Sequence, residues 1–266
     1  KDQITIIKGS ITSIEGIIET IRNNGVRKII NLAYHLDSES DQFPHEAIKV
    51  NVQGTNNVFE AARIMGIERV VWASSIAVYG DKKRANGVPQ NEDAPCVPIT
   101  VYGAGKQFTE FMIRFYNKRY SMDIVGLRPS AIYGTGRSTG ATSWLSDFVD
   151  MPVKGEVAQL PASPDQTLSW GYVDDTAAAF VAVCQYAGKC PSDIYNIGGY
   201  TATVEEAMDL VVKELPDTKV EYGDRYIYYL DVPDNRRIRE EIGFELKFDL
   251  EKGVKDHILK ARERFK

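Results

Sequence analysis

The sequence predicts an α/β fold, a Rossmann-like doubly wound parallel sheet with a small C-terminal α/β substrate lobe. Two observations support this. Short β-branched runs alternate with helical patterns through the first half of the chain. These runs are apolar almost throughout, which is typical of parallel strands covered by helices on both faces. With 266 residues, 43% of them hydrophobic, the chain can build a substantial core.

The elements are expected in a regular order. A short β-branched run at 3–9 ends in glycine, and the helix after it closes at Asn24-Gly25, a stop signal for a helix. Further strands are expected at 26–33, 67–75, 123–134 and 194–199. Further helices are expected at 44–66, 101–120, 172–188 and 203–215, the last with Thr203 as its N-cap, and the charged tail is also expected to be helical. Loops rich in Gly, Ser, Thr and Pro are expected at 134–144 and 160–170.

This order predicts two regions. Residues 1–135 form a dinucleotide-binding core that lacks the first strand and the Gly-rich turn of such a core. Residues 136–266 mostly form a substrate-binding lobe, and the segments at 170–200 return to the core.

Composition excludes several classes of function. The net charge of −5 provides no basic surface for nucleic acid, and no apolar run approaches the roughly 20 residues that span a bilayer. Cys96, Cys184 and Cys190 have no metal-ligand spacing, so no metal site is expected. No signal peptide is visible, and a reduced, cytoplasmic location is expected.

Tyr102 and Lys106 form the candidate acid/base pair. They lie four residues apart in a predicted helix and therefore on one face of it. A free tyrosine has a pKa near 10, and a neighbouring ammonium group would lower it. Tyr102 could then exchange a proton with a hydroxyl or carbonyl oxygen. Ser75 follows a predicted strand, where its hydroxyl could hold the same oxygen.

Several ordered motifs resemble those of the extended short-chain dehydrogenase/reductases, which include the NAD-dependent epimerases and dehydratases. "KGSI" resembles the family's "GDI", "IINLA" its "VIHLAA", and "NVQGTNNVFEAA" its "NVxGTxNvLeAA". "SSIAVYG", "YGAGK", "LRPSAIYG", "YVDD", "YNIGG" and "DNRRIREEIGF" then follow in family order. The resemblance covers almost the whole chain.

The resemblance implies a role for each matching position. Tyr102 would be the acid/base, and Ser75 and Tyr102 would bracket the reacting C–O group. Lys106 would bind the nicotinamide ribose and lower the pKa of Tyr102. Asn51 would help hold the site. The implied contacts to NAD or NADP, with NAD favoured, are Ser10, Ile11, Leu32, Ala33, Tyr34, Asn51, Ala73, Ser74, Tyr102, Lys106, Pro129 and Ile132. The implied substrate contacts are Ser75, Ile76, Tyr102, Ala131, Arg137 and Arg225.

The chain departs from the family pattern at its start. The family opens with a GxxGxxG turn that holds the pyrophosphate at a helix N-terminus, and no such turn is present. Roughly 50 residues of the usual first βαβ unit are missing, and a fragment of a longer chain is the expected explanation. Ser10 also stands where the family usually has Asp.

The reaction type follows from further departures. Ile76-Ala77 replaces the acidic pair of the dehydratases, which argues against dehydration. Ala131 replaces an Asn, and "TLSWGYVDD" lacks the Arg with which nucleotide-sugar epimerases usually hold a diphosphate. A dehydrogenase or reductase acting on a sugar-like or other small polar alcohol is therefore expected.

Three further expectations come with this interpretation. A nucleotide-sugar 4-epimerase is the alternative, and a catalytically silent dinucleotide-binding or structural relative is the alternative of another class. A homodimer through a four-helix bundle is also implied by the resemblance. Phe111 and Phe115, on the helix that carries Tyr102, could belong to that interface or to the core.

Overall fold

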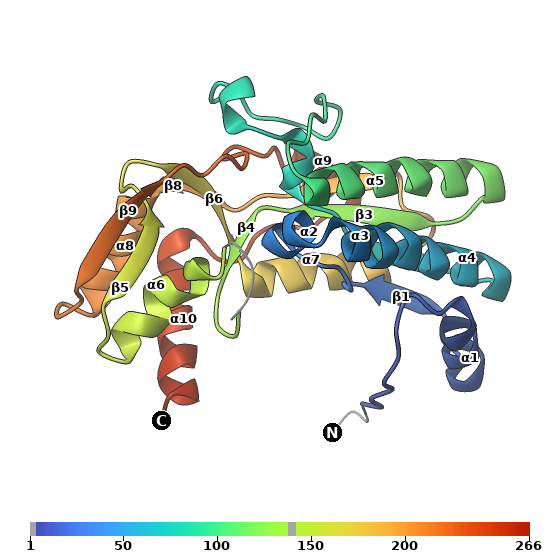
Figure 1. The fold of residues 1–266 in the computed structure, drawn as a ribbon, viewed down its shortest axis with the longest axis horizontal. Coiled ribbons are helices and arrows are strands. Elements are labelled where there is room, and N and C mark those ends of the chain that lie inside the picture. Colours follow the sequence, from blue (N-terminus) through green and yellow to red (C-terminus); the bar gives the residue numbers. More distant parts are fainter. Residues whose placement is uncertain (1–3, 138–141) are drawn as a thin grey trace.

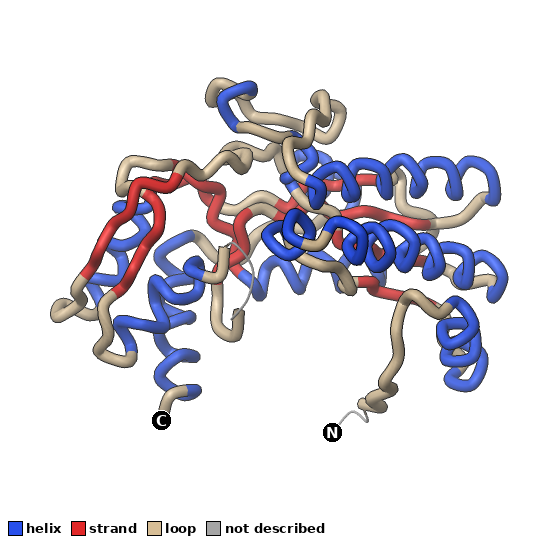
Figure 2. The backbone as a smooth tube through the Cα atoms, viewed as in Figure 1, coloured by secondary structure: helices blue, strands red, loops and turns tan. Residues whose placement is uncertain are grey.

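The computed structural model describes residues 4–137 and 142–266. Its centre is a fully parallel sheet in the order β1-β2-β3-β7. These strands are β1 (Lys28–Asn31), β2 (Arg69–Ala73), β3 (Ile124–Pro129) and β7 (Ile194–Ile197). Figures 1 and 2 show the helices packed around this sheet and a second group of strands at one end of the molecule. The predicted α/β class with a parallel sheet is confirmed.

Helices cover both faces of the central sheet. One buried cluster joins α1 (Ile14–Asn24), α4 (Thr55–Met65) and α5 (Val101–Tyr120) to strand residues such as Trp72. The cluster on the opposite face joins α7 (Val173–Gln185) and α9 (Arg236–Ile242) to the strand side chains that point the other way, such as Val71 and Val125. This two-sided burial explains why the strands are apolar almost throughout. Helix α5 has the predicted bounds.

The edge of the sheet at β1 is open in the described part of the chain. No described strand pairs with the outer side of β1, and the side chains of Ile30 and Leu32 are 38% and 62% exposed. The strand expected at 3–9 is wrong, because residues 4–9 are unpaired coil and Ile6 is 91% exposed. A β-branched run forms a strand only where a neighbouring strand completes its hydrogen-bond ladder.

The helix expected at 44–66 is present but interrupted. It consists of α3 (Pro44–Ala47), a π-helical turn η1 (Ile48–Gly54) and α4, and the short α2 (Asp37–Gln42) precedes it. The π-turn carries Asn51 on its inner side, and such turns often occur at functional sites. Two short 3₁₀ turns, η2 (Ile76–Tyr79) and η3 (Lys82–Arg84), follow β2.

The strand expected at 123–134 is divided at Ser130. Its second part, β4 (Ala131–Tyr133), leaves the central sheet and pairs with β6 (Thr167–Tyr172), which in turn pairs with β8 (Tyr200–Thr203). The loop expected at 160–170 is therefore largely wrong, because β5 (Ala158–Ala162) and β6 both enter it. Of the prolines and serines that suggested a loop, Pro161 lies near the end of β5, Ser163 and Pro164 lie in the turn between these strands, and Ser169 lies within β6.

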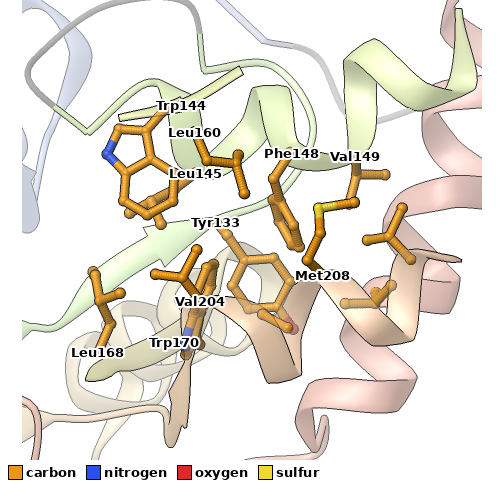
Figure 3. Close-up of a cluster of buried hydrophobic side chains, with 14 of the residues drawn as sticks. Tyr133, Trp144, Leu145, Phe148, Val149, Leu160, Leu168, Trp170, Val204 and Met208 are labelled. Carbon is orange, nitrogen blue, oxygen red and sulfur yellow. The ribbon is translucent and has the colours of Figure 1, made fainter. Parts of the chain in front are cut away.

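The C-terminal lobe is built on its own hydrophobic core. The helices α6 (Trp144–Val153), α8 (Val204–Glu214) and α10 (Leu250–Arg264) surround the sheet β4-β6-β8 and the parallel pair β5 and β9 (Val220–Arg225). Figure 3 shows Tyr133, Phe148 and Trp170 interlocked at its centre. Thr203 caps α8 with Glu206 in a capping box, as expected. Residues 138–141 of the loop expected at 134–144 lie outside the described residues, and α6 begins at Trp144.

The segment at 170–200 bridges the two regions. Helix α7 packs against β1, β2 and β3, and β7 forms the far edge of the central sheet beside β3. The proposed boundary near residue 135 remains a prediction. Within the described residues, no helix combines the length and apolarity needed to cross a membrane.

Candidate active site

A pocket of about 580 Å³ lies at the carboxyl edge of the central sheet, where the C-terminal lobe meets it. Ligands of open α/β sheets bind at this edge. Predicted site residues on its lining are Leu32, Tyr34, Ala73, Ser74, Ser75, Ile76, Tyr102, Lys106, Pro129, Ala131, Ile132 and Arg137. Positions scattered over more than 100 residues of sequence thus converge on one cavity.

Other predicted residues lie elsewhere. Ser10 and Ile11 line a separate pocket beside the open edge of β1. The backbone N–H of Ala33 donates to Asn31 Oδ1, and Ala33 lines neither pocket. Arg225 ends β9 and also lies outside both.

The first turn of α5 is placed by a cap and a glycine. The hydroxyl of Thr100 accepts from the backbone N–H of Gly103 at 3.0 Å. A Cβ at Gly103 would lie 2.7 Å from the carbonyl oxygen of Ala77, so only glycine lets α5 approach η2 this closely. Since η2 directly follows Ser75, this contact brings Tyr102 beside the Ser75 hydroxyl.

Tyr102 is neutral in this environment. Burial raises its pKa to about 12, a hydrogen bond with Ser75 opposes the rise, Asp37 adds to it, and Arg137 opposes it. The expected lowering by Lys106 does not appear. Burial lowers the pKa of Lys106 as well, which reduces the positive charge that it offers to Tyr102.

Lys106 is 2% exposed, and its Nζ donates to the carbonyl oxygen of Ala73. The same Nζ lies 3.4 Å from the ring centroid of Tyr34, 4.6 Å from that of Trp72 and 5.3 Å from that of Tyr102. Burial lowers the pKa of Lys106 well below its usual value, and the charge of Glu110 opposes this. The ammonium group therefore lies among aromatic faces and one carbonyl group.

The two serines after β2 differ in role. Ser74 is buried and donates to Glu110 Oε1 at 2.6 Å, which makes it a structural hydroxyl. Ser75 Oγ accepts from the backbone N–H of Ala77 at 3.1 Å and lines the pocket. The Ser75 hydroxyl group is also hydrogen-bonded to Tyr102, so a ligand oxygen would take the place of that contact.

Asn51 supports the pocket from behind. Its Oδ1 accepts from the backbone N–H of His35 at 2.7 Å, and its Nδ2 donates to the His35 carbonyl oxygen and to Ser40 Oγ. The amide group is thus occupied in fixing the loop that carries Tyr34 and Asp37. It does not line the pocket.

Asp37 and Tyr229 are pocket residues that the sequence reasoning missed. Asp37 Oδ2 accepts from the hydroxyl groups of Tyr228 and Tyr229 at 2.5 Å and 2.7 Å. Asp37 Oδ1 is buried and has no hydrogen-bond partner within the described chain. The available signal was position alone, since Asp37 follows the carboxyl end of β1.

The pocket residues fit the nicotinamide half of a dinucleotide. Ser130 lines the cavity with a buried hydroxyl group that has no partner in the described chain, and buried polar atoms are normally paired. Lys106, Ala73 and the strip Pro129–Ile132 flank it. The described residues upstream of β1 include no Gly-rich turn that could hold a pyrophosphate.

Comparison with known proteins agrees with this geometry. Residues 1–198 match the NAD dependent epimerase/dehydratase family. The chain belongs to this family. It is an NAD-dependent enzyme of the extended short-chain dehydrogenase/reductase type, whose members include epimerases and dehydrogenases.

Individual relatives represent both reactions. The UDP-glucose 4-epimerase of Mycolicibacterium smegmatis is 29% identical over 223 residues, which cover 80% of this chain and 68% of that protein. The mitochondrial L-threonine 3-dehydrogenase of Bos taurus is 27% identical over 222 residues, which cover 82% of this chain and 58% of that protein.

A solved structure shares the Rossmann-like fold. The UDP-glucose 4-epimerase of Thermus thermophilus, in complex with NAD, superposes with a TM-score of 0.84 at 23% identity. The superposition covers 96% of this chain and 83% of that one.

The ionisation of Tyr102 can be measured directly. The phenolate difference absorbance between wild type and Tyr102→Phe should titrate near pH 12, not near neutrality. Because the folded pKa lies above the unfolded value of about 10, Tyr102 contributes stability below pH 10 that is lost as the pH rises towards 12. A difference titration complete by pH 9 would contradict the burial argument.

Proposed function

We propose that the enzyme interconverts a secondary alcohol and a ketone on a small polar substrate, as a dehydrogenase or reductase. The observation that carries this is the convergence of Tyr102 and Ser75 on one pocket wall, with Lys106 directly behind them. A phenol and a second hydroxyl group can bind one oxygen atom while a proton is exchanged.

Each side chain has a separate task. Tyr102 donates its proton to a carbonyl oxygen during reduction and accepts it from the alcohol during oxidation. The Ser75 hydroxyl donates a hydrogen bond to the same oxygen. Lys106, with Pro129–Ile132, would hold the nicotinamide side of the cofactor. When bound, NAD supplies the hydride chemistry, and the protein supplies orientation and the proton.

Charge in the pocket supports a small substrate. Arg137 is the one arginine on the lining as far as the structure describes it, and Asp37 lines the same cavity. A nucleotide-sugar diphosphate would place its negative charges near this carboxylate group with few cationic groups to balance them. Nucleotide-sugar epimerases usually hold the diphosphate with an Asn and an Arg. Ala131 stands at the position of the Asn, and the stretch that lacks the Arg contains the buried Trp170.

The 4-epimerase alternative is supported by relatives with that activity. The two reactions are separated by cofactor balance. A dehydrogenase accumulates reduced NAD or NADP when offered alcohols, sugar acids or hydroxy amino acids. Isomer exchange of a UDP-sugar without net change in the cofactor would overturn the dehydrogenase proposal. Dinucleotide binding without any turnover would favour the silent dinucleotide-binding relative, and failure to bind either dinucleotide would favour a purely structural one.

The proton transfer predicts the behaviour of one variant. Tyr102→Phe should lower turnover by about 100-fold or more while cofactor binding persists, because the phenol acts only on the reacting oxygen. Stopped-flow turnover and cofactor fluorescence would measure the two quantities. Tyr200→Phe is the control, because this exposed tyrosine lies outside the pocket lining. Undiminished turnover in Tyr102→Phe would remove the acid/base role.

Asp37 should select a substrate with a hydrogen-bond donor. Its Oδ1 lacks a partner in the described chain, so a substrate hydroxyl or ammonium group that reaches it would gain a hydrogen bond to a carboxylate group. Asp37→Asn should raise KM by about tenfold with a smaller change in kcat.

Glu39→Gln is the matched control, because this exposed acid lies on the same short helix outside the pocket. An unchanged KM in Asp37→Asn would exclude Asp37 from substrate binding.

We also propose a homodimer in which α5 and the helix at 44–65 form a four-helix bundle. Phe108, Phe111 and Phe115 on α5 are 49%, 62% and 46% exposed, so a large aromatic surface faces away from the core. Phe111→Glu should shift the sedimenting mass from dimer to monomer. A monomeric wild type at micromolar concentration would contradict this assembly.

A further inference from the structure

The ring of Tyr34 lies between β1 and α5 and contacts the centre of the candidate site. Its centroid is 3.4 Å from Lys106 Nζ and 5.4 Å from the Tyr102 ring, which meets it edge-on at 87°. The ring also makes an edge contact with Trp72 at 6.2 Å. Its hydroxyl oxygen is buried and has no hydrogen-bond partner in the described parts of the chain. The position of this ring is therefore set by packing, not by its polar atom.

Gly105 provides the space that the ring occupies. A Cβ at this position would lie 2.7 Å from the Tyr34 hydroxyl oxygen. The next nearest atoms, Val52 Cγ2 and Tyr34 Cζ, are 3.8 Å and 3.9 Å away, which is ordinary van der Waals contact. Glycine is a poor residue for a helix interior, so its presence on α5 requires a local reason. The hydroxyl group of Tyr34 is that reason.

We propose that Tyr34 is a positioning residue for Lys106, and that Gly105 admits its ring to the face of the ammonium group. The proposal rests on the proposed function for its catalytic consequence. The packing of Tyr34 against Lys106 does not depend on which reaction the enzyme catalyses. Gly105 and Tyr34 form a matched pair across the interface between the β1 loop and α5.

The need for such a ring follows from the surroundings of Lys106. To keep a positive charge against the burial that lowers its pKa, the Lys106 amine must replace its lost water contacts. The Ala73 carbonyl oxygen supplies one, while Glu110, the acid one turn along α5, is bound by Arg128 and Ser74. The faces of Tyr34 and Trp72 supply the remainder as cation–π contacts.

The titratable groups around this point come from several elements. Tyr34 faces Lys106 from the β1 loop, while Tyr102 and Glu110 face it along α5. Asp37 and Arg137 act on Tyr102 from the pocket wall. Loss of the Tyr34 ring should therefore change the seating of Lys106 first and the ionisation of Tyr102 only through it.

A double-mutant cycle tests the pair. Gly105→Ala forces the Tyr34 ring away from Lys106 and should lower kcat by about tenfold with a shifted pH profile of kcat. Tyr34→Phe removes only the hydroxyl group, and its own kcat is the reference against which the double variant is compared. Tyr34→Phe with Gly105→Ala should regain most of the lost activity, because the alanine methyl then faces the ring carbon at ordinary contact distance.

A second readout requires no turnover. Brief acetic anhydride labelling followed by peptide mass spectrometry reports access to each lysine, with the exposed Lys118 as the internal standard. Lys106 should label several-fold faster in Gly105→Ala and in Tyr34→Leu than in wild type, and at the wild-type rate in Tyr34→Phe and in the double variant. Thermal melting confirms that each variant is folded, and Tyr34→Leu carries the test if Gly105→Ala does not fold.

The outcomes separate the two proposals. An inactive wild type with the expected labelling pattern would refute the proposed function and keep the role of Tyr34. Wild-type labelling of Lys106 in Tyr34→Leu would overturn the role of Tyr34. A double variant as impaired as Gly105→Ala would also overturn it, since the damage would then come from the helix and not from the ring.

Discussion

The candidate site depends on the buried ion pair between Glu110 and Arg128. Arg128 Nε and Nη2 donate to the two oxygen atoms of Glu110 at 2.8 Å and 2.6 Å, and both residues are fully buried. The pair joins α5 to β3 directly behind the pocket. Ser74 donates to the same carboxylate group, and Arg128 Nη1 donates to the Tyr79 hydroxyl at 2.7 Å. Removing one partner of such a pair leaves a buried charge, typically at a cost of about 3–5 kcal/mol.

This pair sets the position of the catalytic helix. Tyr102, Lys106 and Glu110 are spaced by four residues and lie on one face of α5. When Glu110 is bound to β3, the other two side chains point towards the carboxyl ends of the strands. Asn51 fixes the opposite wall through the backbone of His35. The chemistry of the pocket thus rests on polar contacts among residues that, apart from Ser74, lie outside its lining.

Sequence reasoning predicted the regular parts of this arrangement. The strands β1, β2, β3 and β7, the whole of α5 and the capping box at Thr203 follow from local patterns of apolar, glycine and capping residues. It failed where a partner distant in sequence decides. Residues 4–9 have β-branched side chains and no strand to pair with, whereas β5 and β6 form in spite of Pro161 because β9 and β8 pair with them.

In the site, too, local sequence patterns predict some features, and residues distant in sequence decide the others. Motifs placed Ser75, Tyr102 and Lys106 beside one another, but the four-residue spacing does not fix where the ammonium group points. That direction depends on Tyr34 and on the Ala73 carbonyl oxygen, which belong to other elements. Asp37 carries no motif, and only the folded loop brings it opposite Tyr102.

The protonation state of Tyr102 favours reduction over oxidation at this site. A phenol with a pKa of about 12 is protonated at neutral pH, so it is ready to donate to a carbonyl oxygen during reduction. Oxidation needs the opposite state, which burial and Asp37 both disfavour. The hydrogen bond with Ser75 and the charge of Arg137 favour the phenolate. Lys106 Nζ would add to them only if it moved from its place against the Tyr34 ring towards the hydroxyl group. The packing of one aromatic ring therefore bears on which direction of the reaction is fast.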